Sequence, residues 1–248
     1  MDIDFDKGQH FLTNKKIIDK EIKVAEISKK DKIIEIGAGK GILTEKLAGK
    51  AGKVLAFEID SKFKDYLNKL EKNHTNLKIL YEDALNHDWK GYNKIVSNIP
   101  YFIAGDLILK SIKENIEEIV IIVGENFKLL LEGKQGKIGI IGNLFFDINY
   151  ISEVEKQSFE PAPKVNSWLI QLKEKKLDKV DSILKKILCK NGKIKNAILY
   201  SLVEERKTKN QAREFISSLK LDNRILNKPV KMITGNFLMR LKQNFQLL

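Results

Sequence analysis

The chain has little cysteine, histidine or proline: its 248 residues include one Cys, three His and four Pro. The single cysteine, Cys189, excludes a disulfide within the chain and a metal site built from cysteines. His10, His74 and His87 stand at unrelated spacings, so we expect no metal site. This composition is typical of a protein of the reducing cytoplasm.

Long apolar runs are missing as well. No stretch approaches the roughly 18 apolar residues that a membrane-spanning helix needs. The first four residues, Met-Asp-Ile-Asp, are too acidic for a secretory signal. We therefore expect a cytoplasmic protein that does not associate with membranes.

Positive charge, in contrast, is abundant and unevenly placed. The chain carries 45 Lys and Arg against 33 Asp and Glu, a net charge of +12. Residues 176–248 hold 17 of the basic and 6 of the acidic residues, and so almost the whole surplus. A basic segment of this kind suits contacts with nucleic-acid phosphates, although a solvated lysine-rich surface is the alternative.

The charge break coincides with a change of pattern. Up to about residue 175, short apolar runs alternate with helical patterns, which predicts a doubly wound, mostly parallel sheet. We expect segments 141–151 and 165–172 to be antiparallel edge strands. Beyond them only helical periodicity is found, at 180–188, 194–203, 210–219 and 235–245. The sequence thus predicts an α/β domain over 1–175 and a small all-α domain over 176–248.

A glycine-rich turn follows the strand predicted at Ile33–Ile36. Residues 37–41 read Gly-Ala-Gly-Lys-Gly and precede a predicted helix, a context in which the backbone approaches a ligand closely. The third glycine comes one residue too early for the dinucleotide fingerprint G-x-G-x-x-G. Glu58 ends the next strand, where it would accept hydrogen bonds from a ribose diol. Together with Asp83, which follows the strand after that, these positions favour S-adenosylmethionine over NAD.

Asn98, Ile99, Pro100 and Tyr101 follow the apolar run 94–97. Adenine N6 is a poor nucleophile because its lone pair is delocalised, so a catalyst gains by accepting hydrogen bonds from its N–H groups. The Asn98 side-chain oxygen and a backbone carbonyl held by the proline both accept, and Tyr101 offers a face for an extruded base. An ordinary strand-ending turn is the alternative. Combined with the strand-end carboxylates, the motif predicts an amino-directed nucleobase methyltransferase.

The chain resembles the ribosomal RNA adenine N6,N6-dimethyltransferases, most closely their small-subunit, kasugamycin-sensitivity branch in its archaeal form. The matching segments occur in the family's order over about two thirds of the chain, at residues 8–12 (GQHFL), 35–41 (EIGAGKG), 58–60 (EID), 82–85 (EDAL), 97–101 (SNIPY) and 159–167 (FEPAPKVNS). The resemblance implies a Rossmann-like methyltransferase domain with a seven-stranded sheet, followed by a small all-α domain.

The resemblance also implies a cofactor site for S-adenosylmethionine. His10 and Leu12 would touch the methionine part, while Glu58 and Asp83 would bind the ribose and the adenine. For Asp83, a solvated loop carboxylate is the alternative. The remaining cofactor-site residues are Gln9, Gly37, Gly39, Ala84 and Asn98.

The implied substrate site begins at Asn98, which would bridge the cofactor and the target amine. Tyr101 and Phe159 would sandwich the target adenine, although from the residues alone Phe159 is equally a core side chain. Lys164 lies in the loop that carries Phe159. A stretch that is rich in arginine in the family here reads Cys189–Asn196, and its candidate RNA contacts are Lys190, Lys193 and Lys195.

We therefore expect an enzyme that dimethylates N6 of adjacent adenosines near the 3′ end of small-subunit rRNA. It would act as a monomer on the small-subunit precursor, with a role in ribosome biogenesis. Dimethylation of large-subunit rRNA stays open, because the Asn-Ile-Pro-Tyr and Pro-Lys-Val-Asn-Ser segments of the macrolide-resistance branch are equally close. A non-catalytic assembly or transcription factor on the same fold is a further alternative, against which the intact cofactor positions argue.

Overall fold

The computed structural model describes residues 10–219 and 221–246. The chain forms two compact units. The first comprises the residues up to Leu129 together with Phe146–Glu174, and the second comprises Leu130–Phe145 together with the residues from Lys175 onward. Within the described ranges, no helix is both long and apolar enough to cross a membrane.

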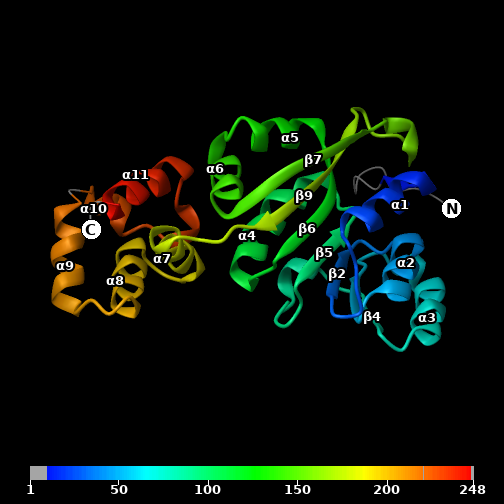
Figure 1. The fold of residues 1–248 in the computed structure, drawn as a ribbon, viewed down its shortest axis with the longest axis horizontal. Helices are drawn as coiled ribbons and strands as arrows, with labels where there is room; N and C mark the ends of the chain where they lie inside the picture. The colour runs from blue at the N-terminus through cyan, green and yellow to red at the C-terminus, as the bar shows by residue number, and fades with distance from the viewer. Residues whose placement is uncertain (1–9, 220, 247–248) are drawn as a thin grey trace. The chain divides into compact units, whose positions relative to one another are not determined.

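A seven-stranded sheet with the order β4-β3-β2-β5-β6-β9-β7 forms the centre of the first unit (Figure 1). Five neighbouring strands are parallel: Lys32–Ile36 (β2), Lys53–Phe57 (β3), Leu77–Leu80 (β4), Lys94–Ser97 (β5) and Glu118–Gly124 (β6). Strand β9 (Ser167–Glu174) runs antiparallel to both β6 and β7 (Phe146–Val154). The predicted mostly parallel, doubly wound sheet is confirmed. Of the two predicted antiparallel edge strands only β7 lies at an edge, because β9 lies between β6 and β7.

Five helices of the described ranges accompany the parallel strands: three connect consecutive strands, one precedes the first of them and one follows the last. They are α1 (Lys15–Val24), α2 (Ile42–Lys50), α3 (Lys64–Asn73), α4 (Ala104–Glu114) and α5 (Glu125–Glu132). Ile18 of α1, Leu47 of α2 and Leu67 of α3 share one apolar cluster with strands β2 and β3. Right-handed crossovers between parallel strands place α4 on the opposite face, because β5 and β6 lie on the other side of β2.

A two-stranded sheet joins the start of the described chain to a segment far along it. Phe11–Leu12 (β1) pairs antiparallel with Phe159–Glu160 (β8). The pairing continues into the next residues, where the backbone N–H of Thr13 donates to the Ser158 carbonyl over 2.9 Å. The segment before α1 is therefore fixed beside the segment that carries Phe159.

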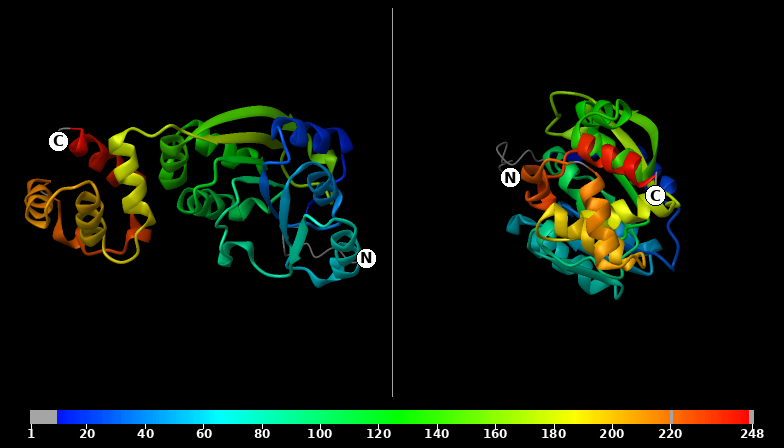
Figure 2. Two further views of the ribbon diagram at one scale, coloured as in Figure 1. Left: turned by 60° about the horizontal axis from the view of Figure 1, so that its bottom comes forward. Right: turned by 90° about the vertical axis from the view of Figure 1, so that its left-hand side faces the viewer.

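The second unit is helical over its described residues (Figures 1 and 2). Its elements are α6 (Gly136–Phe145), α7 (Lys179–Cys189), α8 (Ile194–Glu204), α9 (Lys209–Ser218), α10 (Asn223–Leu226), a 3-10 turn at Val230–Met232 and α11 (Gly235–Phe245). Side chains cap several of the N-termini: Asp178 accepts from the Asp181 N–H, and Thr208 forms a capping box with Gln211. The four helices predicted after residue 175 are confirmed.

The strand predicted over 141–151 is wrong in its first part. Helix α6 continues to Phe145, and β7 begins only at Phe146. This helix is apolar on most sides, and Ile141, Leu144 and Phe145 are buried. Gly235 of α11 packs against Ile140 in the same unit. A helix buried on several sides loses the polar face that reveals helical periodicity in a sequence.

Candidate functional site

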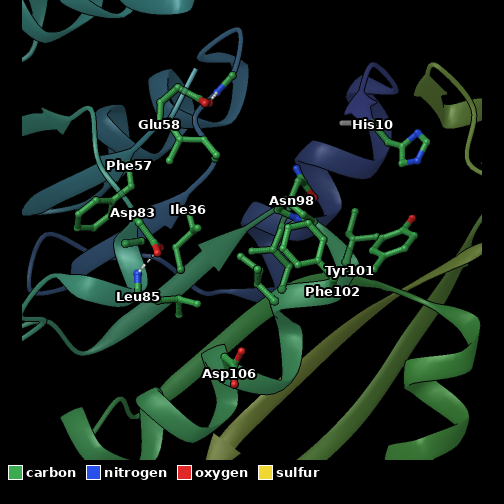
Figure 3. A pocket seen from close by; sticks show the side chains of 18 of the residues that line it. His10, Ile36, Phe57, Glu58, Asp83, Leu85, Asn98, Tyr101, Phe102 and Asp106 are labelled. Atoms are coloured by element: carbon green, nitrogen blue, oxygen red, sulfur yellow. Dashed lines mark hydrogen bonds between the residues drawn. The ribbon is translucent and has the colours of Figure 1, made fainter. Parts of the chain in front are cut away.

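A cavity of about 650 Å³ lies at the carboxyl ends of the parallel strands (Figure 3). This edge is where open α/β sheets bind their ligands. Ten of the predicted site residues line the cavity: His10, Gly37, Gly39, Glu58, Asp83, Ala84, Asn98, Pro100, Tyr101 and Phe159. The structure thus brings together side chains that are separated by up to 149 positions in the sequence.

The glycine turn approaches the cavity through its backbone. Gly37 and Gly39 have φ values of +81° and +50°, in the left-handed region that glycine adopts most readily. The Gly37 N–H donates to the Phe57 carbonyl over 2.8 Å. A Cβ atom on Gly39 would come within 3.1 Å of the Phe11 ring. Both glycines are therefore required by the local backbone, whatever ligand the turn holds.

Glu58 is buried at the end of β3, and backbone groups fix its carboxylate. One oxygen, Oε2, accepts from the Gly39 N–H over 2.7 Å, and Oε1 accepts from the Asp60 N–H over 2.8 Å. Each carboxylate oxygen has more than one lone pair, so both keep an acceptor position for a ligand. The carboxylate consequently holds the glycine turn and faces the cavity at the same time (Figure 3).

Asp83 lies at the start of a short 3-10 turn, Ala84–Asn86, that follows β4. Its Oδ1 accepts from the Leu85 N–H, and its Oδ2 accepts from Asn86 Nδ2, both over 2.9 Å. Ala84 is buried beside it, and the Ala84 carbonyl accepts from Trp89 Nε1 over 2.9 Å. Asp83 is exposed yet lines the cavity, so the position is both a solvated cap and a ligand-facing carboxylate.

Asn98 follows β5 directly, and its carboxamide is partnered on one side only. Its Nδ2 donates to Oε2 of Glu21, on α1, over 3.3 Å. Its Oδ1 is buried and has no hydrogen-bond partner among the described residues. A buried carbonyl oxygen without a partner is costly, so a ligand N–H that reached it would relieve this cost. The free acceptor belongs to a residue that lines the cavity.

Two buried carboxyl groups lie next to this amide. Burial raises the pKa of Glu21 to about 8, assisted by repulsion from Glu35 and opposed by the hydrogen bond from Asn98. Burial also raises the pKa of Glu35 to about 8, with the nearby Thr44 hydroxyl opposing the shift and repulsion from Glu58 assisting it. Both carboxyl groups are therefore mostly protonated at pH 7.

Tyr101 is the first residue of a 3-10 turn, Tyr101–Ile103, and Pro100 is the N-cap of this turn. Its hydroxyl is hydrogen-bonded to the Ser167 hydroxyl, and its ring packs against Gly124. Burial raises the pKa of the phenol, although the bond from Ser167 opposes the shift. The His10 ring is nearly parallel to the Tyr101 ring, with 6.4 Å between their centroids (Figure 3).

The strand pair β1–β8 brings His10 and Phe159 to the cavity. His10 Nδ1 donates to the Pro161 carbonyl over 2.8 Å. Phe159 is only 6% exposed and belongs to the main apolar cluster while it lines the cavity. Leu12, its partner across the strand pair, is buried in the same cluster and does not line the cavity. Gln9 lies outside the described residues.

The four predicted lysine contacts do not line the cavity. Lys164 is exposed in the first unit. The other three belong to the second unit, where Lys190 forms an ion pair with Glu204 over 2.6 Å and Lys193 and Lys195 are exposed around the start of α8. Among the described residues that line the cavity there is no lysine or arginine, and their charged groups are the carboxylates of Glu58, Glu82, Asp83 and Asp106. An acidic cavity in a chain of net charge +12 suits a cationic ligand.

Several residues around the site are not among the predicted site residues. Three of them, Glu21, Gly124 and Ser167, contact Asn98 or Tyr101. The sequence does contain a signal for Glu21, since it stands three residues after Ile18 and directly before Ile22 on the apolar face of α1. A carboxylate at such a position is unusual and points to a local role. Ser167 ends the 159–167 segment that carries the family resemblance, but its contact with Tyr101, like that of Gly124, depends on the pairing of β6 with β9.

The strand order, the glycine turn and the cavity at the strand ends define a Rossmann-like methyltransferase fold. The sequence matches the model of a protein family described as "Ribosomal RNA adenine dimethylase" over residues 2–235. The chain belongs to this family.

Two curated relatives illustrate the match. A probable ribosomal RNA small subunit methyltransferase A of Methanococcus maripaludis is 31% identical over 227 residues, 86% of each chain. The protein of the same description from Pyrococcus abyssi is 36% identical over 174 residues, which span 68% of this chain and 64% of that protein.

Solved structures support the fold. A dimethyladenosine transferase from Plasmodium falciparum aligns over 96% of this chain and 98% of its own, with a TM-score of 0.66 and 24% identity. The 23S rRNA methyltransferase ErmE aligns over 95% and 99%, with a TM-score of 0.64 and 19% identity. Both alignments thus extend over at least 95% of the chain, and each of these structures is a counterpart of similar fold.

Proposed function

We propose that this protein transfers methyl groups from S-adenosylmethionine to N6 of adjacent adenosines near the 3′ end of small-subunit rRNA, giving dimethyladenosine. The observation that carries the proposal is the Asn98 carboxamide, whose buried oxygen has no partner among the described residues, in a residue that lines an acidic cavity at the strand ends. The names of the archaeal relatives support the choice of small-subunit rRNA.

The cavity fits the proposed cofactor. Glu58 offers two fixed carboxylate oxygens for a ribose diol, and Asp83 offers an acceptor for an adenine amino group at the end of the next strand. The surrounding carboxylates match a ligand that carries a positive charge. When it is bound, S-adenosylmethionine supplies a methyl group on a positively charged sulfur.

The protein's own contribution is to hold the target amine. Asn98 Oδ1 would accept a hydrogen bond from the amine, which favours a tetrahedral nitrogen with an available lone pair. Tyr101 would stack on the extruded base, as enzymes that modify bases require. Alignment of the reacting atoms contributes about 7–11 kcal/mol in favourable cases. Transfer would leave a neutral S-adenosylhomocysteine and a positively charged N6, which is acidic enough to release its proton to water without a strong general base.

The test uses purified protein, S-adenosylmethionine labelled in the methyl group, and three substrates: immature small subunits, large subunits and naked rRNA. Label is mapped on the RNA, and the digested nucleosides are separated into mono- and dimethyladenosine. We expect dimethyladenosine at adjacent positions in small-subunit rRNA. Label confined to large-subunit RNA would reject the proposed target, and a complete lack of transfer would favour a non-catalytic factor on this fold.

A further inference from the structure

Helix α1 is aliphatic where it packs on the sheet, except at one position. Ile18, Ile22 and Ala25 are buried as expected, and between them Glu21 is also fully buried, with 0% exposure. A buried carboxyl group lowers stability unless its polar atoms are well partnered. Here Oε2 has a partner, Asn98 Nδ2, whereas Oε1 has none among the described residues. The side chain is therefore poorly explained by packing or by stability.

The partner of Glu21 is the residue at the centre of the proposed site. A carboxamide has an acceptor end and a donor end, and rotation by half a turn exchanges them. Only one orientation offers Oδ1 to the amine of a target base. In the structure Glu21 receives the donor end over 3.3 Å, and the acceptor end remains unpartnered.

We propose that Glu21 is a positioning residue, which holds the Asn98 carboxamide by its Nδ2 so that Oδ1 is offered to the amine of the target adenosine. This inference rests on the proposed function. Glu21 acts through Asn98 and touches neither the substrate nor the cofactor in this assignment.

The neighbouring groups indicate which substitution preserves the role. Glu35 is buried nearby, and burial together with Glu35 raises the pKa of Glu21 to about 8. At pH 7 the side chain is therefore mostly a neutral acid, whose carbonyl oxygen accepts as a glutamine carbonyl does. Glu21→Gln keeps that acceptor, whereas Glu21→Met has a side chain of similar length without an oxygen.

The kinetic test compares both variants with the parent in single-turnover methyl transfer at saturating S-adenosylmethionine and rRNA. We expect Glu21→Met to slow transfer at least tenfold, with cofactor affinity within threefold of the parent, and Glu21→Gln to stay within threefold in both. Ile18→Val, which alters packing on the same helix one turn earlier, is the control and should transfer at the parent's rate. Equal slowing by Gln and Met, or a parental rate in Glu21→Met, would overturn the proposal.

A second readout does not depend on activity. The side-chain amide signals of Asn98 in a ¹⁵N-labelled protein are assigned from their loss in Asn98→Ala. We expect Glu21→Met to shift these signals and speed their hydrogen exchange, and Glu21→Gln to leave them close to the parent's. If the parent modifies no RNA, the proposed function fails, and these signals alone decide the role of Glu21. Signals unchanged in Glu21→Met would refute it.

Discussion

The ring of Tyr101 lies directly against Gly124, at the end of β6. A Cβ atom on Gly124 would come within 3.0 Å of Tyr101 Cδ2, closer than packed carbon atoms approach. The other end of the tyrosine is held by its hydrogen bond with Ser167, on β9. The aromatic face proposed to receive the target base is thus oriented by two residues outside the Asn-Ile-Pro-Tyr motif.

Gly124→Ala should therefore disturb the substrate site more than the fold. The added methyl group pushes the Tyr101 ring, and overpacking of this kind costs about 1–3 kcal/mol in stability. We expect methyl transfer to fall at least fivefold while affinity for S-adenosylhomocysteine stays within threefold. Gly49→Ala is the control, because a Cβ atom there meets nothing within 4 Å. A Gly124→Ala protein as active as the parent would show that the ring has room to move.

Asn98→Ala should abolish most transfer and leave the protein folded. The carboxamide lies at a strand end and its oxygen has no partner among the described residues, so the cost in stability comes from Glu21 Oε2, which loses the Asn98 Nδ2 donor. We expect single-turnover transfer to fall by more than tenfold, a barrier increase above about 1.4 kcal/mol. Unfolding in denaturant checks the fold, and Asn73→Ala, at the exposed end of α3, is the matched control. A folded variant within tenfold of the parent would contradict the assigned role.

Glu58→Ala should act mainly on cofactor binding. Hydrogen bonds to a charged group contribute about 1.5–3 kcal/mol each, so loss of one ribose contact predicts a decrease in affinity of at least tenfold. Part of the loss reflects the glycine turn, whose Gly39 N–H loses its acceptor. Titration calorimetry with S-adenosylhomocysteine measures the effect. Asp65→Ala removes the same charge from an exposed position on α3 and should bind like the parent.

The buried pair Glu21 and Glu35 predicts a dependence of stability on pH. Each pKa rises from 4.5 to about 8 on folding, so the folded protein holds protons that the unfolded chain has released. The stability associated with these protons is complete below pH 4.5 and is lost as the pH rises through 8. The slope is at most about 1.4 kcal/mol per pH unit for each group.

The measurement is the free energy of unfolding of the parent and of Glu21→Gln between pH 5 and 8. The difference between the two curves removes the contribution of the titrating groups that do not interact with Glu21, and it retains the coupling of Glu21 to Glu35. We expect the stability of Glu21→Gln to decline less steeply than that of the parent. Parallel curves would mean that Glu21 is ionised in the folded protein at these pH values.

Local patterns in the sequence predicted the parallel strands and the polar residues at their ends, whereas the family resemblance was needed for His10 and Phe159, which the structure also places at the cavity. Apolar runs followed by a glycine turn, Glu58 or Asn98 indicate strand ends that meet at one edge of a parallel sheet. The sequence pattern does not reveal helix α6, because apolar residues lie on most sides of this helix and leave little helical periodicity. The contacts of Tyr101 with Gly124 and Ser167 depend on strand pairing between distant segments, which no local pattern specifies.

The basic charge of the second unit is best tested by substitution rather than by truncation. A chain cut at residue 175 would retain α6 but lose α11, against which α6 packs through Ile140 and Gly235. Such a fragment would expose apolar surface that is buried in the whole protein. Lys193 and Lys195 are exposed and border the start of α8, whereas Lys190 already pairs with Glu204.

We predict that Lys193→Ala combined with Lys195→Ala weakens binding to small-subunit particles and leaves cofactor affinity unchanged. Each phosphate contact contributes roughly 0.7–0.9 to the slope of log affinity against log salt, so the loss of two contacts should lower the slope by up to about 1.8.

The control, Lys72→Ala with Lys90→Ala, removes the same charge from exposed positions of the first unit. Equal losses in both pairs would mean that net charge alone attracts the RNA. Parental affinity and slope in the Lys193 and Lys195 variant would mean that these lysines are only a solvated surface, and that the RNA is bound elsewhere.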